Sequence, residues 1–266
     1  MTQEFDIAAG TYDADFTLSH TGKLQRDMVW KHLDQRLTAK KHMHILELNC
    51  GTGEDAVHLA QKGHVVTATD ISQEMLAQAK TKIETKGLNC KVQLKQADIK
   101  AIEAWDENEK FDLIFSNFGG FNCVEAKDLE VFKSKVSKHL TDKGAVILVV
   151  MPEYCLWESL YFLMKLRFTQ VFRRKKPYAM ADVSGVKVKT WYYSPKKLKQ
   201  LFKPEFKSVK LKPIGFFAPP SYLETMMQRN LWLFKLMSFL EKQLTGFEWQ
   251  GPFSDHYYIE LEGVNR

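Results

Sequence analysis

The sequence predicts an α/β fold around a mostly parallel sheet, because short apolar stretches alternate with helical stretches along its first 151 residues. A polar residue also follows or ends each of the first four apolar stretches: Glu47, Asp70, Asp98 and Asn117. Parallel strands bring their carboxyl ends to one edge, and ligands of open α/β sheets bind at that edge. We therefore expect a ligand site where these four side chains converge.

An arm and a helix precede the first strand. Residues 1–22 combine aromatic side chains with two glycines, which predicts an irregular or partly helical arm. Residues 23–41 place Leu24, Met28 and Leu33 at helical spacing, which predicts an amphipathic helix. We treat residues 1–42 as one N-terminal unit.

Residues 43–151 are expected to form the core of the domain. The predicted strands are apolar or rich in β-branched residues, and they cover 43–49, 64–70, 91–97, 111–117 and 144–151. The predicted helices between them cover 54–62, 72–86 and 129–140. Ser72 is a suitable cap for the second of these helices, and Gly63 and Gly87 follow the ends of the first two.

The chain changes character over residues 152–266, where aromatic and basic residues are frequent. Helices are predicted over 154–172, 194–202 and 221–244, and strands over 186–193, 206–217 and 256–262. We expect the helices 154–172 and 221–244 to cap the strand ends of the same domain with an apolar pocket. The alternative is that they simply contribute to the core.

Composition limits the compartment and the partners. The chain shows no secretory signal at its N-terminus, no run long enough to span a membrane, and four separated cysteines, so we expect free thiols in the cytoplasm. The net charge of +6 divides into −3 for residues 1–150 (19 basic, 22 acidic) and +9 for residues 151–266 (19 basic, 10 acidic). The basic stretch 160–215 is then a solvated face, a dock for an acidic carrier protein or an anionic substrate, or a contact with an anionic membrane surface. We expect no nucleic-acid partner.

The glycine loop, residues 49–53, admits two kinds of cofactor. A dinucleotide needs helix N–H groups facing its pyrophosphate and an acid, here Asp70, for its ribose. S-adenosylmethionine instead carries a sulfonium and an ammonium cation, so its site should be acidic. Glu47, Glu54 and Asp55 would repel two phosphates at this loop, which favours the cationic ligand.

The successive motifs LELNCGTGED, TATDIS, QADI and FDLIFSNFG, with a further strand after Lys143-Gly144, resemble those of class I S-adenosylmethionine-dependent methyltransferases. The resemblance covers residues 43–151 and implies a Rossmann-like, seven-stranded, mostly parallel sheet with an antiparallel last strand and a helical cap. Asn49 stands where the family has its first loop glycine. The arm FDxxAxxYD, Phe5 to Asp13, resembles the N-terminal lid of small-molecule members.

The resemblance also implies which residues hold S-adenosyl-L-methionine. Grouped by the part of the cofactor that they would face, these are Glu47, Asn49, Gly51 and Gly53 for the methionine part, Asp70 for the ribose hydroxyls, Ile71, Asp98 and Ile99 for the adenine, Asn117 and Phe118 for the sulfonium, and Tyr12 closing from the arm. We expect no metal, because the four cysteines are widely spaced without a CxxC pair.

The acceptor side offers two histidines as general bases, His20 in the arm and His256 at the start of the last strand. Methyl transfer is a displacement at carbon that positioning and desolvation promote, whereas an alcohol acceptor needs a base. We therefore expect in-line methyl transfer to a small lipophilic or aromatic molecule, with oxygen the favoured acceptor atom. Two alternatives stay open: a non-catalytic S-adenosylmethionine-binding or carrier-protein-binding module, and an NAD-dependent oxidoreductase.

Overall fold

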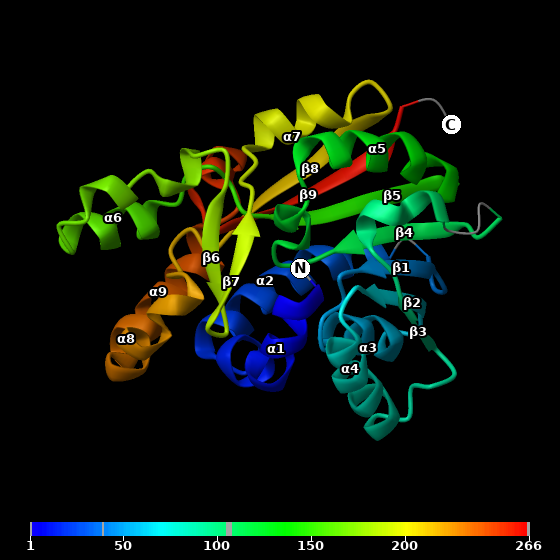
Figure 1. Cartoon of the computed structure of the whole chain (residues 1–266), viewed down its shortest axis with the longest axis horizontal. Helices are drawn as coiled ribbons and strands as arrows, with labels where there is room; N and C mark the ends of the chain where they lie inside the picture. Colours follow the sequence, from blue (N-terminus) through cyan, green and yellow to red (C-terminus); the bar gives the residue numbers. More distant parts are fainter. Residues whose placement is uncertain (1, 39, 105–107, 265–266) are drawn as a thin grey trace.

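The protein is described by a computed structural model over residues 2–38, 40–104 and 108–264, and its centre is a seven-stranded sheet (Figure 1). The strand order is β3-β2-β1-β4-β5-β9-β8, and only β9 runs antiparallel to its neighbours within this sheet. The predicted fold class and the antiparallel last strand are therefore confirmed. The strands are β1 His44–Leu48, β2 Val65–Asp70, β3 Val92–Gln96, β4 Phe111–Ser116, β5 Leu140–Val150, β8 Phe206–Ile214 and β9 His256–Gly263.

Helices cover both faces of this sheet, and a separate hairpin stands beside it (Figure 1). The helices are α1 Thr2–Tyr12, α2 His20–Leu37, α3 Glu54–Gln61, α4 Gln73–Thr85, α5 Ala126–Val136, α6 Leu156–Met164, α7 Pro195–Phe202, α8 Glu224–Arg229 and α9 Leu231–Leu244. The hairpin pairs β6 (Ala179–Val183) with β7 (Val186–Thr190). The sequence indicated β7 but not β6.

Two apolar layers follow from the alternation of side chains along the central strands. Ile45 of β1 packs with Leu33 of α2 and Leu59 of α3 on one face. Leu46, the next residue of β1, packs on the opposite face, in the layer that contains Phe132 of α5. Because both faces of β1 are covered, its run of apolar residues is nearly continuous.

Two predicted helices are shorter or broken. The helix expected over 154–172 ends at Met164, and Leu166 then adopts a positive φ of 56°, which a right-handed helix excludes. The helix expected over 221–244 is interrupted at Asn230, whose φ of −131° lies outside the helical region. α9 contributes no residue to the lining of the central cavity, whereas the other expected cap segment, 154–172, lines it with Tyr161, Phe162, Arg167 and Gln170.

A buried carboxylate joins three elements of the fold. Asp55, in the first turn of α3, accepts hydrogen bonds from Arg26 Nη1 (2.7 Å), Trp30 Nε1 (2.6 Å) and Asn117 Nδ2 (2.9 Å). Arg26 and Trp30 belong to α2, and Asn117 follows β4. Since Arg26 is also buried, its positive charge depends on Asp55 for compensation.

We expect Asp55→Asn to lower the free energy of unfolding by about 3–5 kcal/mol, because it leaves the buried Arg26 charge without its partner. The matched control is Glu54→Gln in the adjacent position. Glu54 is paired with Lys82 in a partly exposed bridge, so its loss should cost less than about 1 kcal/mol. Urea titrations of the three proteins measure both values, and equal costs for the two variants would contradict the assignment of Asp55.

Candidate active site

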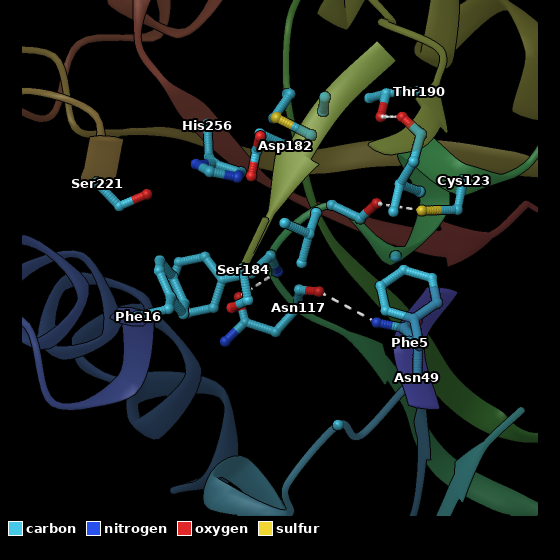
Figure 2. Close-up of a pocket in the computed structure, with 18 of the residues that line it drawn as sticks. Phe5, Phe16, Asn49, Asn117, Cys123, Asp182, Ser184, Thr190, Ser221 and His256 are labelled. Atoms are coloured by element: carbon cyan, nitrogen blue, oxygen red, sulfur yellow. Dashed lines mark hydrogen bonds between the residues drawn. The ribbon is translucent and has the colours of Figure 1, made fainter. Parts of the chain in front are cut away.

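A cavity of about 740 Å³ lies at the carboxyl edge of the sheet. Residues after β1, β2, β3 and β4 line it, together with residues of the arm, the β6–β7 hairpin and the segment after α6. In Figure 2, Asn49 and Asn117 meet on one side of the cavity, and His256 and Ser221 lie on the other. The volume is within the range of sites that bind a cofactor or a small molecule.

Asn49 shapes the glycine loop. Its φ of 47° lies in the left-handed region that asparagine tolerates. Its Oδ1 accepts a hydrogen bond from the Ser116 hydroxyl (2.7 Å), and its Nδ2 donates to the carbonyl oxygen of Asn117 (3.2 Å). The amide also covers Gly120, where a Cβ would come within 2.0 Å of Asn49 Cγ. The loop keeps its left-handed turn with asparagine in place of glycine because residue 120 has no side chain.

Asp70, at the end of β2, is tied to the same loop. The Gly51 N–H donates to its Oδ2 (2.8 Å), and the Ser72 N–H donates to its Oδ1 (3.0 Å). Burial raises the pKa of Asp70, although these backbone donors oppose the shift. A carboxylate can accept about four hydrogen bonds, so Asp70 retains capacity for a diol in the cavity that it lines.

Ile71, Asp98 and Ile99 form the far end of the cavity. Asp98 accepts a hydrogen bond from the Lys100 N–H at one oxygen, Oδ1 (2.9 Å). The two isoleucines are half-buried beside it. Apolar side chains next to a carboxylate suit a flat aromatic ring that carries an amino group.

The N-terminal arm is fastened over the loop at two points. Asp13 accepts a hydrogen bond from the Thr52 hydroxyl (2.6 Å), and Asp6 accepts one from the Ser72 hydroxyl (2.5 Å). Tyr12 lies between these two bonds along the arm and lines the cavity. Burial raises the pKa of Tyr12 to about 12, so this side chain remains a neutral phenol.

Asn117 and Phe118 occupy the middle of the site, directly after β4. Both atoms of the Asn117 side-chain amide form hydrogen bonds. Its Nδ2 donates to Asp55 Oδ2 (2.9 Å), and its Oδ1 accepts from the Phe118 N–H (2.9 Å). The Phe118 ring packs edge to face against Phe16 (4.8 Å) and His256 (5.5 Å). Phe118 therefore separates the loop end of the cavity from the histidine end.

His256 stands beside a buried carboxylate. Its Nδ1 lies 3.3 Å from Oδ2 of Asp255, which also accepts hydrogen bonds from Arg174 Nη2 (2.8 Å) and Gln25 Nε2 (3.1 Å). Burial alone would raise the pKa of Asp255, but His256 and Arg174 outweigh it and hold that pKa well below its usual range. Asp255 thus stays ionised next to an imidazole that lines the cavity, which suits a proton acceptor.

Arg173 and Arg174 are part of the basic run 173–176, yet both turn inward. Glu158 accepts hydrogen bonds from Arg173 Nε (2.7 Å) and Arg174 Nε (3.1 Å). Arg174 is only 4% exposed. Two arginines are thus matched by Glu158 and Asp255, so this end of the cavity carries no excess positive charge from them.

The loop end of the site is acidic, and the cations beside it are already paired. Arg26 is bound to Asp55 and Lys82 to Glu54 (2.8 Å). Among the described residues, Glu47 Oε2 is buried without a hydrogen-bond partner. Burial, together with the Asp55 carboxylate, raises the pKa of Glu47 well above its usual range, which favours its neutral form. Because Arg26 and Lys82 are each held by a carboxylate, they do not supply the positive charge that a pyrophosphate needs.

The core of the chain also matches a known family. Residues 45–144 match the family model described as a methyltransferase domain. The resemblance to methyltransferases that the sequence motifs indicated is therefore confirmed for this core.

Curated relatives named as methyltransferases match part of this chain. The putative methyltransferase YqeM of Bacillus subtilis (strain 168) is 33% identical over 116 residues, which are 43% of this chain and 44% of the relative. Malonyl-[acyl-carrier protein] O-methyltransferase of Bacillus anthracis is 32% identical over 120 residues, 44% of this chain and 40% of that protein. The chain spans less than half the length of these relatives.

Solved structures extend the similarity of fold beyond the methyltransferase domain. The alignment with the DhpI–SAH complex covers 100% of this chain and 96% of the DhpI chain, with a TM-score of 0.61 and 16% identity. The alignment with the PH0226 protein from Pyrococcus horikoshii OT3 covers 95% of this chain and 94% of that protein, with a TM-score of 0.61 and 15% identity. At these identities the similarity shows the fold.

Most of the predicted site residues line the cavity: Tyr12, Asn49, Gly51, Asp70, Ile71, Asp98, Ile99, Asn117, Phe118 and His256. Glu47 is buried outside the lining. Gly53 also lies outside it and packs against Ala79 of α4, where a Cβ would come within 2.8 Å of the alanine Cβ.

The structure does not bring His20 to the cavity. Its side chain is 49% exposed, and its Nδ1 is bonded to Glu224 Oε1 (2.8 Å). Glu224 also accepts hydrogen bonds from the N–H groups of His20 and Thr21, at the start of α2. His20 is therefore a partner in fixing a helix end, and the structure does not support it as the base.

Sequence reasoning missed the residues that support His256. Asp255 is adjacent to His256 in the sequence, so an Asp-His pair was visible there. No local pattern reveals the bonds of Arg174, because its partners Glu158 and Asp255 lie 16 and 81 residues away. Tertiary contacts alone distinguish these inward arginines from a solvated basic run.

Gly120→Ala should lower the free energy of unfolding by about 1–3 kcal/mol, because the new methyl group would overlap Asn49. In an Asn49→Gly background the same change should cost less, since the overlapping amide is gone. Chemical denaturation of the wild type, both single variants and the double variant gives the coupling energy, for which we expect about 1 kcal/mol or more. Additive effects would contradict the contact between positions 49 and 120.

Proposed function

We propose that this protein transfers the methyl group of S-adenosyl-L-methionine to a small lipophilic or aromatic molecule, with oxygen as the acceptor atom. The proposal is carried by one cavity that joins an acidic loop end to an aromatic end with a buried histidine. Relatives named as O-methyltransferases, including ubiquinone biosynthesis O-methyltransferase of Coxiella burnetii, lend it support. The solved structures with a similar fold include complexes with S-adenosylmethionine and with its product, S-adenosylhomocysteine. This supports S-adenosylmethionine as the cofactor.

The cofactor would lie along the carboxyl ends of β1, β2 and β3. Asp70 would accept hydrogen bonds from the ribose hydroxyls, and Asp98 from the adenine amino group, between Ile71 and Ile99. Tyr12 would close the site from the arm. When bound there, S-adenosylmethionine supplies an electrophilic methyl group on a sulfonium.

His256 would act as the general base. As the acceptor oxygen bonds to the methyl carbon, the carbon–sulfur bond would break and S-adenosylhomocysteine would leave. His256 would take up the hydroxyl proton, and Asp255 would stabilise the resulting imidazolium. The apolar rings of Phe118 and Phe16 would exclude water and hold a lipophilic acceptor in line.

In this proposal the three segments of the chain divide the work within one domain. Residues 1–42 supply the lid, residues 43–151 bind the cofactor, and residues 152–266 complete the sheet and enclose the acceptor. We place the enzyme in the cytoplasm because its described cysteines are all unpaired. An acidic carrier protein is one way to present the acceptor to the basic second half of the chain.

We expect Asp70→Asn to weaken binding of S-adenosylhomocysteine by about 10- to 100-fold, because a charged acceptor for the ribose hydroxyls is lost. Asp142→Asn, on an exposed residue of β5, is the control and should bind as the wild type does. Titration calorimetry measures both affinities. Unchanged affinity of Asp70→Asn would remove Asp70 from the site, and tight NAD binding without any response to S-adenosylhomocysteine would overturn the proposed cofactor.

His256→Gln should lower kcat by about 10²–10⁴-fold while leaving S-adenosylhomocysteine affinity unchanged, because only proton removal is lost. The wild-type rate should also decline in acid, where a protonated imidazole cannot accept a proton, and the variant should lack this decline. The assay uses a panel of phenols, fatty acids and carrier-bound thioesters.

His20→Gln is the matched control for this experiment, since His20 lies outside the cavity and should be replaceable without loss of rate. Equal activities of the two histidine variants would argue against His256 as the base. Cofactor binding without turnover of any acceptor in the panel would favour the non-catalytic alternative.

A further inference from the structure

Two segments project from the molecule with large apolar side chains in solvent. Residues 154–180 include α6, and residues 226–247 include α9; we call them the projecting segments. Figure 1 shows α6 and the α8–α9 pair extending beyond the sheet at the end opposite β3. On α6, Leu156, Leu160 and Leu163 recur at helical spacing with 49%, 47% and 50% exposure.

α9 carries a similar stripe. Trp232, Leu236 and Phe239 follow one another at i, i+4 and i+7, and they are 70%, 47% and 60% exposed. The same spacing puts Lys235 and Lys242 together along one flank of this stripe, and both are exposed. The outer face of α9 is therefore apolar with a basic border.

The turn after α6 has a strained backbone and exposes large apolar side chains to solvent. Leu166 has a φ of 56°, a conformation that is unfavourable for leucine, and its side chain is 75% exposed. Phe168, two residues later, is 62% exposed. Both side chains are therefore mostly in solvent, where a surface outside the chain could cover them.

The exposed charge of the projecting segments is entirely positive. Each segment contains one acid, Glu158 or Glu241, and both are buried. Glu158 is bound by Arg173 and Arg174, and Glu241 accepts hydrogen bonds from backbone N–H groups of residues 215–218. The exposed basic residues that have no ion pair within the described ranges are Lys165, Arg167, Lys175, Lys176, Arg229, Lys235 and Lys242.

We propose that the projecting segments dock on the surface of a lipid bilayer with anionic headgroups. Apolar stripes bordered by lysine and arginine insert at the boundary between headgroups and acyl chains, while the basic residues bind the anionic lipids. None of the helices within the described ranges is long and apolar enough to cross a membrane, so the contact is peripheral. A second copy of this chain fits less well, because the same basic face on both partners would repel.

Docking in this way would place the cavity next to the lipid surface. Phe162 and Arg167 of the first projecting segment line the cavity, and so does Ser221, just before α8. A lipophilic acceptor could then enter from the bilayer. This delivery step rests on the proposed methyl transfer, whereas the docking itself does not.

Co-sedimentation with vesicles tests the docking without cofactor or acceptor, so its failure would leave the proposed reaction untouched. The full chain should pellet with vesicles of phosphatidylcholine and phosphatidylglycerol, and about tenfold or more weakly with phosphatidylcholine alone. Added salt should weaken the binding. Trp232→Ser/Phe239→Ser, Leu166→Ser/Phe168→Ser and Lys235→Glu/Lys242→Glu should each lose about tenfold or more in affinity.

The controls change equivalent residues away from the projecting segments. Val131→Ser alters an exposed valine of α5, and Lys41→Glu/Lys86→Glu reverses two charges near the amino ends of β1 and β3. Thermal unfolding verifies that every variant is folded. The proposal is overturned if the wild type stays in the supernatant, or if the controls lose as much affinity as the test variants.

Two further outcomes would identify a different occupant and also overturn the proposal. Binding of an acidic acyl carrier protein but not of the vesicles would assign the face to a carrier. A wild-type dimer that Trp232→Ser/Phe239→Ser converts to a monomer, with no vesicle binding by either protein, would assign it to a second copy. Sedimentation velocity distinguishes both outcomes.

Discussion

The geometry of the site depends on one buried charge, the carboxylate of Asp55. A desolvated carboxylate is tolerable only when its oxygens are fully engaged, and Asp55 meets that condition with donors from α2 and from the end of β4. The position of α2 relative to the sheet is therefore restricted by electrostatics as well as by packing. Because the arm enters α2 directly, the same charge also restricts where the lid can lie.

The sequence predicted the structure well where the same local pattern occurs several times along the chain. Alternating strands and helices and the acids at strand ends were enough to predict the sheet and the loop end of the cavity. It was less informative where a residue's environment comes from distant partners. His256 was visible as a candidate, but its supporting Asp255–Arg174 interaction joins segments 81 residues apart.

The helices after β5 show the same limit. Apolar periodicity over 221–244 indicated a helix but could not indicate which partner covers it. α9 has its only buried side chain at Glu241, whereas Trp232, Leu236 and Phe239 are exposed. Composition suggested a roof over the site, and the structure instead shows an uncovered surface. The break at Asn230 was equally hidden, since asparagine within a helical pattern carries little signal.

The basic residues in the second half of the chain lie in two different environments, and counting charges in the sequence cannot tell these environments apart. Arg173 and Arg174 are neutralised inside, so the acceptor pocket does not gain from them a preference for anions. The lysines of the projecting segments that have no ion pair within the described ranges stay exposed to solvent.

The contact between Asn49 and Gly120 also constrains how this loop could have changed over time. The two positions are separated by most of the core, yet the asparagine is sterically permitted only opposite a residue without a side chain. A lineage with a larger residue at position 120 does better to acquire glycine there first, and reversion at position 120 is disfavoured while asparagine persists. The order of substitution is therefore biased by the overlap of a single methyl group with one amide.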